Sequence, residues 1–258
     1  MGIKSLVIFE KIPIKLNPRS GSPASDGGAH EPRDIACAFQ RHFSVVSPLG
    51  FASQVLDAED RTGHVNIRFS AKDVAQIIKK MVRGKSPGHD SLSIEHLKYA
   101  GIHLPRVLAL LFNFCISHSY LPDDLMHTVV VPIVKDKTGD SSDLSNYRPI
   151  SLATVIAKVL DSLLDRQLEK HLHLHGAQFG FRPGLSTESA ILCLKQTVQY
   201  YTGRNTPIYY ACFLDLSKAF DLVCYDKLWQ KLKCETDVPH ENVSLLRYWY
   251  SKQQNAVR

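Results

Sequence analysis

The run at 208–221 offers the clearest chemistry in this 258-residue chain, because an apolar and aromatic segment there ends on Asp215. β-Branched and aromatic residues favour strands, so we predict a strand that ends at this acid. Such a strand would lift the carboxylate out of a buried sheet into a cleft, where a divalent metal and a triphosphate could be held. Taken alone, Asp215 is better explained as an acid that caps a strand or a helix. The case for a site therefore depends on neighbouring motifs.

Three further motifs precede this run. They are Pro-Gly-His-Asp at 87–90, Asn-Tyr-Arg-Pro-Ile at 146–150 and Gln-Phe-Gly-Phe-Arg-Pro-Gly-Leu-Ser-Thr at 178–187. Together with Phe-Leu-Asp-Leu-Ser-Lys-Ala-Phe-Asp at 213–221, they resemble in content and order the reverse transcriptases of LINE-type, non-LTR retrotransposons. The resemblance covers about 31–258 and is stronger from Phe69 onward.

This resemblance implies an RNA-directed DNA polymerase that performs template-directed nucleotidyl transfer. In the family, a primer 3′-hydroxyl attacks the α-phosphorus of a dNTP, while two Mg²⁺ ions clamp the attacking and leaving oxygens. The implied partners are an RNA template, a DNA primer and a dNTP. Asp215 is then a catalytic residue and a metal ligand, and the Leu216 carbonyl is a second ligand, since Mg²⁺ prefers oxygen.

The resemblance also implies dNTP contacts, which it places at Lys135, Arg148, Ser217, Lys218 and Phe220. A guanidinium fork pairs with phosphate oxygens at two points, which suits Arg148. Phe220 stands where the family packs an aromatic ring under the incoming sugar, and a bulky ring there excludes a ribose 2′-hydroxyl. Lys137 is nearly as good a phosphate contact as Lys135. Without the motifs, Phe220 would be read as a core residue and Arg148 as a surface arginine.

The loop at 178–187 is a candidate nucleic-acid contact. Gly180 and Gly184, with Arg182 between them, would let the backbone approach a template strand. Phosphate contacts of this kind are independent of sequence and sensitive to salt. The alternative is a plain loop-to-helix turn in which Thr187 caps the helix, and the two readings are compatible. A net charge of +6 and a pI of about 8.9 suit a nucleic-acid partner without requiring one.

Composition limits the class of protein and its compartment. The six cysteines are far apart and form no Cys-x-x-Cys pair, so we expect neither a zinc module nor a disulfide framework. A reducing, intracellular compartment (nucleus or cytoplasm) is therefore expected. No apolar run is long enough for a signal peptide or a membrane span. The sequence does not indicate an oligomeric state.

Three histidines near the middle of the chain also attract attention. His171, His173 and His175 alternate with other residues and would share one face of a strand, as metal ligands do. The surrounding pattern instead predicts the end of a long helix, where residues two apart do not face each other. Histidines at a helix C-terminus complement its dipole. We therefore expect no metal site there.

The elements that must position these residues mix helices and strands without strict alternation, which predicts the α+β class. Apolar spacing and capping signals predict helices from about 31, and at 70–82, 105–118, 151–172, 187–201, 226–233 and 243–250. A strand at 129–134 contains Pro132, which favours an edge position. Pro149 is expected to break the chain again.

By resemblance, the fold is a fragment of the fingers and palm of a right-hand polymerase, helix-rich with a small, incomplete antiparallel palm sheet. We expect a flexible segment at 1–30, a helical region at 31–125 leading into the fingers, and the reverse transcriptase domain at 126–258. The family's Pro-Gln-Gly block and aromatic-x-Asp-Asp hairpin do not occur in this sequence. One carboxylate cannot hold two Mg²⁺ ions about 3.5–4 Å apart, so we expect little polymerase activity from this chain alone. The alternatives are a non-catalytic RNA- or DNA-binding relic and a helical interaction protein.

Overall fold

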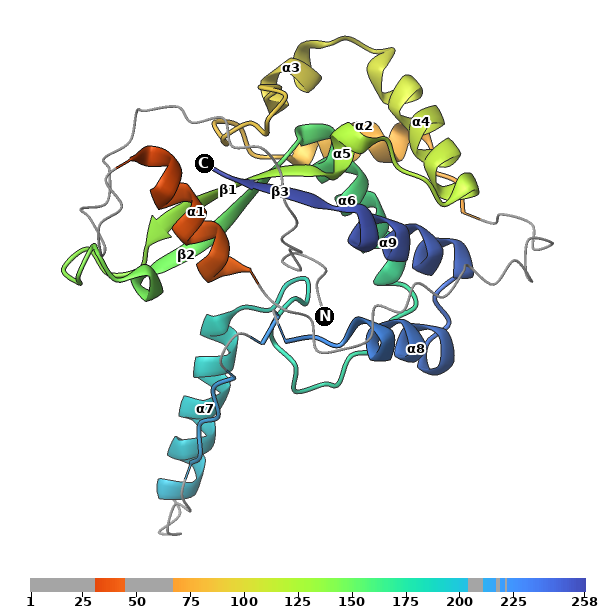
Figure 1. Ribbon diagram of the computed structural model, residues 1–258. Coiled ribbons are helices and arrows are strands. Elements are labelled where there is room, and N and C mark those ends of the chain that lie inside the picture. Colours follow the sequence, from red (N-terminus) through yellow and green to blue (C-terminus); the bar gives the residue numbers. More distant parts are fainter. Residues whose placement is uncertain (1–30, 45–66, 204–210, 217–218, 221) are drawn as a thin grey trace.

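The computed structural model describes residues 31–44, 67–203, 211–216, 219–220 and 222–258. The segment predicted to be flexible at 1–30 lies outside these residues. Most of the described secondary structure is helical and one small sheet accompanies it, which confirms the α+β class (Figure 1).

The described helices and strands follow the order of the chain. They are α1 (Pro32–Phe43), α2 (Ala71–Lys80), α3 (Ile94–Tyr99), α4 (Leu104–His118), α5 (Asp123–Met126), β1 (His127–Val134), the 3₁₀ turn η2 (Leu144–Asn146), β2 (Tyr147–Ala153), α6 (Val155–Leu168), α7 (Thr187–Thr202), α8 (Tyr225–Glu235), α9 (His240–Lys252) and β3 (Gln254–Val257). The helices predicted at 70–82, 105–118, 187–201, 226–233 and 243–250 correspond to α2, α4, α7, α8 and α9.

The three strands form a mixed sheet in the order β2-β1-β3. β1 runs antiparallel to β2 and parallel to β3. The sheet is therefore small, as expected, but it is not purely antiparallel. β1 lies at its centre, so the edge position predicted from Pro132 is wrong.

The pairing of two prolines across the ladder explains how a central strand tolerates Pro132. Pro132 lies opposite Pro149, and the ladder continues at Lys135, whose N–H donates to the Asn146 carbonyl. Hydrogen-bonded pairs therefore fall on the odd positions of β1, and the two prolines form a non-hydrogen-bonded pair in which no ladder bond is lost. On the other side of β1, the pairing with β3 ends at Val130. The missing N–H of Pro132 thus points past the end of β3.

The same pairing corrects two expectations about the following segment. Pro149 does not break the chain, because β2 runs through it. The helix predicted at 151–172 begins only at Val155, after Thr154 caps its first turn by accepting from Ala157 N–H, and it ends at Leu168. Leu152 and Ala153 extend the apolar pattern of the helix to the other side of Thr154, although residues 151–153 belong to the strand.

The main hydrophobic core lies among the helices. α2 packs against α4 and α6, and α4 packs against α9. The fully buried side chains that fill this space include Val74, Phe112, Ile116, Leu160, Leu164 and Leu245. A second, smaller core joins α1 to the sheet. The two cores hold the sheet between α1 and the helical body.

α4 carries apolar residues on more than one face. Helical spacing puts Val107, Leu110, Leu111 and Phe114 on one side, but Leu110 is 69% exposed and Phe114 is 54% exposed. The buried side chains are Leu108, Ala109, Phe112, Cys115 and Ile116. α4 is apolar around most of its circumference, so its spacing alone does not define which face meets α2 and α9.

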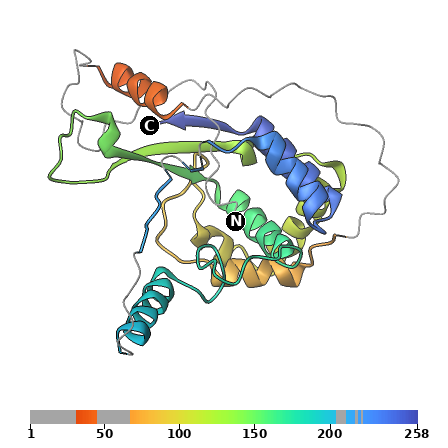
Figure 2. The same cartoon turned by 90° about the horizontal axis from the view of Figure 1, so that it is seen from below.

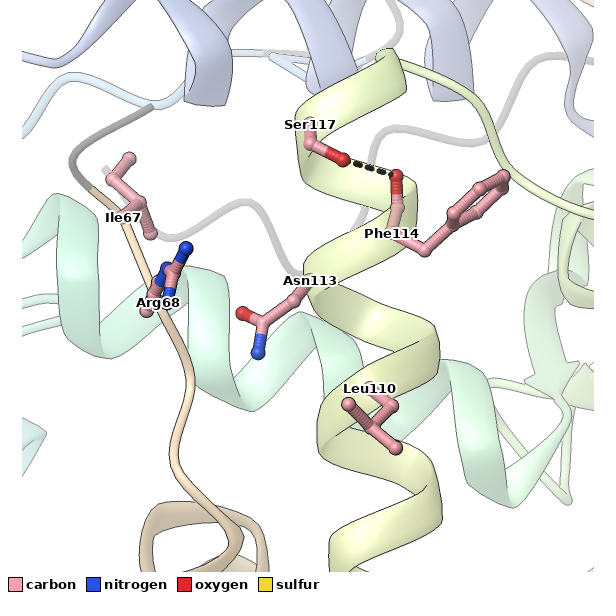
Figure 3. A pocket seen from close by; sticks show the side chains of 6 residues that line it. All are labelled: Ile67, Arg68, Leu110, Asn113, Phe114 and Ser117. Carbon is pink, nitrogen blue, oxygen red and sulfur yellow. Dashed lines mark hydrogen bonds between the residues drawn. The ribbon is translucent and has the colours of Figure 1, made fainter. Parts of the chain in front are cut away.

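The outward face of α4 borders a pocket of about 350 Å³ beside residues 67–68 (Figure 3). Asn113 fixes this wall, because its side chain accepts from Phe69 N–H at 2.7 Å and donates to the Phe69 carbonyl at 2.9 Å. The residues predicted to bind substrate do not line this pocket.

The loop that contains the Pro-Gly-His-Asp motif is fixed on the start of α6. A Cβ at Gly88 would lie 2.8 Å from the backbone N and Cα of Thr154, which is closer than real contacts allow. Asp90 of this loop also interacts with Lys158 of α6. Burial lowers the pKa of this lysine, and the Asp90 carboxylate acts in the opposite direction. Close backbone contact therefore explains why a glycine stands at position 88.

Replacing this glycine tests the contact. We expect Gly88→Ala to lower the free energy of unfolding by about 1–3 kcal/mol, because the methyl group would overpack against Thr154. Gly176→Ala is the matched control, since nothing lies within 4 Å of a Cβ at Gly176. Its effect should stay within about 0.5 kcal/mol. Denaturant unfolding of both variants measures the difference, and equal stabilities would contradict the contact.

Candidate active site

One face of the β1–β2 pair is covered by α1. Val130 and Tyr147 are on this face and pack with Phe39, Phe43 and Val257 in the smaller core. The Phe39 ring meets Tyr147 edge-on, with centroids 4.9 Å apart. Successive residues of a strand point to opposite faces, so the odd positions of β1 and the even positions of β2 point away from α1.

The opposite face carries the predicted phosphate contacts. Arg148 pairs with Ile133 across the ladder, and Lys135 continues it opposite Asn146. Lys135 and Arg148 are therefore diagonal neighbours on one face, about 7–8 Å apart in a regular pair. Both are exposed, and the apolar floor beside them is open, with Ile133 50% and Ile150 41% exposed. Figure 2 shows α1 on one side of the sheet and α6 with α7 on the other.

The connection between β1 and β2 is held by polar side chains. The Asn146 amide accepts from Asp136 N–H and donates to the Asp136 and Asp140 carbonyls. Lys135 Nζ donates to the Ser145 carbonyl at 2.6 Å, which leaves two of its three N–H donors for a ligand. Lys137 lies within the exposed loop, beyond the continued ladder.

Three aspartates of this loop remain ionised to lower pH than usual. Hydrogen bonds from the Thr138 and Ser142 backbones, followed by their hydroxyls, lower the pKa of Asp136 and Asp140. The Ser145 hydroxyl, followed by its backbone N–H, lowers the pKa of Asp143. The loop therefore presents three ionised carboxylates beside Lys135 and Arg148.

The predicted template loop is organised by its own arginine. Nη1 of half-buried Arg182 donates to the carbonyls of His175, Gly176 and Gln178, at 3.2–3.5 Å. Gly184 has a φ of +74°, a conformation that favours glycine. Arg182 thus has a structural role in the loop, and Gly180, which has open space around it, forms part of the same exposed turn.

The helix after this loop is capped one residue earlier than expected. Ser186, not Thr187, is the N-cap of α7, and its hydroxyl accepts from Ser189 N–H at 3.3 Å. Thr187 is the first residue of the helix. α7 projects away from the rest of the molecule and has no buried residue (Figure 1).

The structure brings the template loop to the predicted sugar-packing residue. The Phe181 ring meets the Phe220 ring edge-on, with centroids 5.9 Å apart and planes inclined by 86°. Phe181 has a φ of +60°, which is rare outside glycine, so the backbone turns unusually to place this ring. The sequence placed both residues in motifs but did not indicate that they touch.

Asp215 is not at the end of a strand. Residues 211–216 have no regular secondary structure, and Phe213 and Leu214 are 79% and 90% exposed. No strand of the described residues pairs with this segment. A strand requires a neighbour for its hydrogen bonds, so propensity alone did not form one. Ser217 and Lys218 lie outside the described residues.

Comparison with known proteins identifies the chain. The family model described as "Reverse transcriptase (RNA-dependent DNA polymerase)" matches residues 134–257. A probable RNA-directed DNA polymerase from transposon BS of Drosophila melanogaster is 30% identical over 178 residues, which cover 67% of this chain and 19% of that protein. The corresponding protein of the X-element is 29% identical over 195 residues, covering 74% and 21%. The chain belongs to the reverse transcriptases of non-LTR retrotransposons.

A third relative gives the same result over a similar region. The RNA-directed DNA polymerase from mobile element jockey of Drosophila melanogaster is 29% identical over 169 residues, covering 63% of this chain and 18% of that protein. This chain spans about a fifth of the length of the relatives it matches.

Reverse transcriptases use divalent metal, and the described residues give only part of a site for it. Asp215 and the Leu216 carbonyl are oxygen donors of the kind that Mg²⁺ prefers. Within the described part of the chain, three potential ligand side chains converge elsewhere, at His89, Asp124 and His127. The described residues around Asp215 therefore do not by themselves form a two-metal site.

The internal bonds of Arg182 can be tested directly. Arg182→Ala removes its donation to three carbonyls, so we expect amide hydrogens at 175–186 to exchange about five- to tenfold faster. Arg106→Ala is the control, because Arg106 is an exposed arginine of α4. Hydrogen exchange measured by mass spectrometry gives both rates. Unchanged exchange in Arg182→Ala would show that the loop does not depend on this side chain.

Proposed function

We propose that residues 126–258 supply the nucleotide-binding fingers and the first part of the palm of an RNA-directed DNA polymerase, and that the helical region at 31–125 leads into the fingers. The observation that carries this proposal is the common sheet face of Lys135 and Arg148, opposite the face that α1 covers. Two cations over an open apolar floor suit a triphosphate with its attached sugar and base.

Each residue has a separate task in this proposal. Arg148 grips phosphate oxygens in two places, and Lys135 adds a point charge beside it. Phe220, supported by Phe181, packs under the sugar and selects dNTPs. Ser217 and Lys218 add further triphosphate contacts. Asp215, with the Leu216 carbonyl, contributes to a Mg²⁺ site.

The proposed partners are an RNA template and a DNA primer. The exposed loop with Gly180, Arg182 and Gly184 would contact the template backbone. Arg182 would act there mainly by shaping the loop, because its Nη1 is occupied by three carbonyls. The wide spacing of the six cysteines, with no Cys-x-x-Cys pair, suits a reducing, intracellular compartment. Among the described helices, none is long and apolar enough to cross a membrane.

Nucleotide binding by sheet-face variants tests the proposal. We expect Arg148→Ala to weaken binding of a fluorescent dNTP about tenfold or more, because a charge-assisted phosphate contact is lost. Lys135→Ala should weaken it severalfold. Lys137→Ala is the matched control and should change the affinity less than twofold. The measurement is fluorescence anisotropy with purified chain.

A second ligand makes the test specific for phosphate. The loss in Arg148→Ala should disappear when the probe is the corresponding deoxynucleoside, which lacks phosphates. Equal triphosphate affinities of wild type and Arg148→Ala would contradict the proposal. A larger effect of Lys137→Ala than of Lys135→Ala would move the second phosphate contact into the β1–β2 loop.

Nucleic-acid binding separates the proposed function from a helical interaction protein. We expect affinity for an RNA–DNA template-primer to fall steeply between low and physiological salt, because phosphate contacts release counterions. Filter binding at two salt concentrations measures this change. Absent or salt-independent binding would favour an interaction protein that uses its helices as a docking surface.

A further inference from the structure

Three potential metal ligands meet at the start of β1, at a site separate from Asp215. The side-chain donor atoms of His89, Asp124 and His127 all lie within 4.8 Å of one another. His89 Nε2 is 4.0 Å from Asp124 Oδ1. The two imidazole rings are 5.5 Å apart and inclined by 62°, so they do not stack. Their nitrogens can therefore turn toward a common point.

The distances between these donor atoms are close to those between the ligand atoms of a bound zinc ion. Zinc lies about 2.0–2.2 Å from histidine nitrogen and carboxylate oxygen, which puts two ligand atoms of a tetrahedral ion roughly 3.3–3.5 Å apart. The donor atoms here need to approach by about 1 Å. Rotation of side chains can supply this movement, because the Asp124 side chain is 90% exposed and that of His89 is 30% exposed.

The fold fixes the backbone beneath each ligand. His127 opens β1 and is paired with Gln254 of β3. Asp124 precedes it by three residues and lies in the short helix α5, which His127 itself caps at the C-terminal end. His89 follows Gly88, whose backbone contact with Thr154 holds the loop. Three separate elements thus present one ligand each without a long flexible arm.

We propose that His89, Asp124 and His127 form a binding site for a divalent transition-metal ion, with Zn²⁺ as the natural occupant. Two imidazoles and one carboxylate suit Zn²⁺, Co²⁺ or Ni²⁺, whereas Mg²⁺ prefers an all-oxygen set. Three protein ligands leave one position for water. The site does not depend on the proposed polymerase function, and it is chemically distinct from the Mg²⁺ site expected at Asp215.

A metal at this site would join the 84–93 loop to the sheet. The loop contacts α6 through Gly88, while His127 and Asp124 belong to β1 and the short helix before it. An ion would therefore cross-link the 84–93 loop, which is fixed on α6, to α5 and the start of β1. Binding to the folded state alone raises its stability, so Zn²⁺ should increase the melting temperature of the chain.

Competition with a chromophoric zinc chelator tests the site. We expect the wild-type chain to bind one Zn²⁺ ion at this site, with a higher affinity than any further Zn²⁺ ion that it binds. His127→Asn and Asp124→Asn should each weaken this uptake about tenfold or more, because a direct ligand is lost. His173→Asn is the matched control, since His173 is exposed and outside the cluster. It should retain the wild-type affinity.

The thermal response of the wild-type chain gives a second readout that needs no variant. Zn²⁺ should raise the melting temperature, and the same concentration of Mg²⁺ should not. A variant that remains folded in the presence of a chelator but loses the Zn²⁺ shift would support the site. Wild-type zinc affinity in both ligand variants, or no thermal shift of the wild-type chain with Zn²⁺, would overturn it.

Discussion

The register between β1 and β2 is the constraint on which the candidate site depends. Pro132 lies opposite Pro149, and both strands can contain a proline only because this pair is a non-hydrogen-bonded one. A slip of one residue would place a proline in a hydrogen-bonding position and turn one strand over. Arg148 would then face α1, or Val130 would leave its contact with Phe39 and Phe43. The register that closes the smaller core is therefore also the one that puts Arg148 on the open face.

The helical body supports this sheet at the start of β1, while the open face lies near its other end. Close contact between Gly88 and Thr154 fixes the Pro-Gly-His-Asp loop on α6, directly after β2 ends. The loop before α7 is held differently, by hydrogen bonds from Arg182 to its own backbone. Both glycine-containing motifs thus have a structural explanation that is independent of any ligand. The proposed template contact of the 178–187 loop would use backbone that these hydrogen bonds already fix.

Local signals predicted most of the longer helices, because capping and apolar spacing are properties of one segment. The capping box of Ser70 with Asp73 at the start of α2 is an example.

Features that depend on a partner segment were missed. Residues 151–153 of β2 were read as the start of a helix and Pro149 as a break, because only pairing with β1 accommodates this proline in a strand. The strand expected before Asp215 lacks a neighbour among the described residues. The motifs pointed to Lys135, Arg148 and Phe220. Tertiary structure alone places Lys135 beside Arg148 on one sheet face and brings Phe181 to Phe220. Sequence spacing drew attention to His171, His173 and His175, whereas the structure brings together His89 and His127 from distant segments, with Asp124 as the third donor.

In the proposed function, a triphosphate binds the sheet face opposite α1. Methyl NMR of isoleucine-labelled chain tests it most directly, because Ile133 and Ile150 lie on the open face, Ile35 belongs to α1, and Ile77 is in the helical core. On addition of a dNTP, we expect the Ile133 and Ile150 methyl signals to shift, while Ile35 and Ile77 keep theirs. Shifts confined to Ile35, or a saturable dNTP response that leaves Ile133 and Ile150 unchanged, would contradict it.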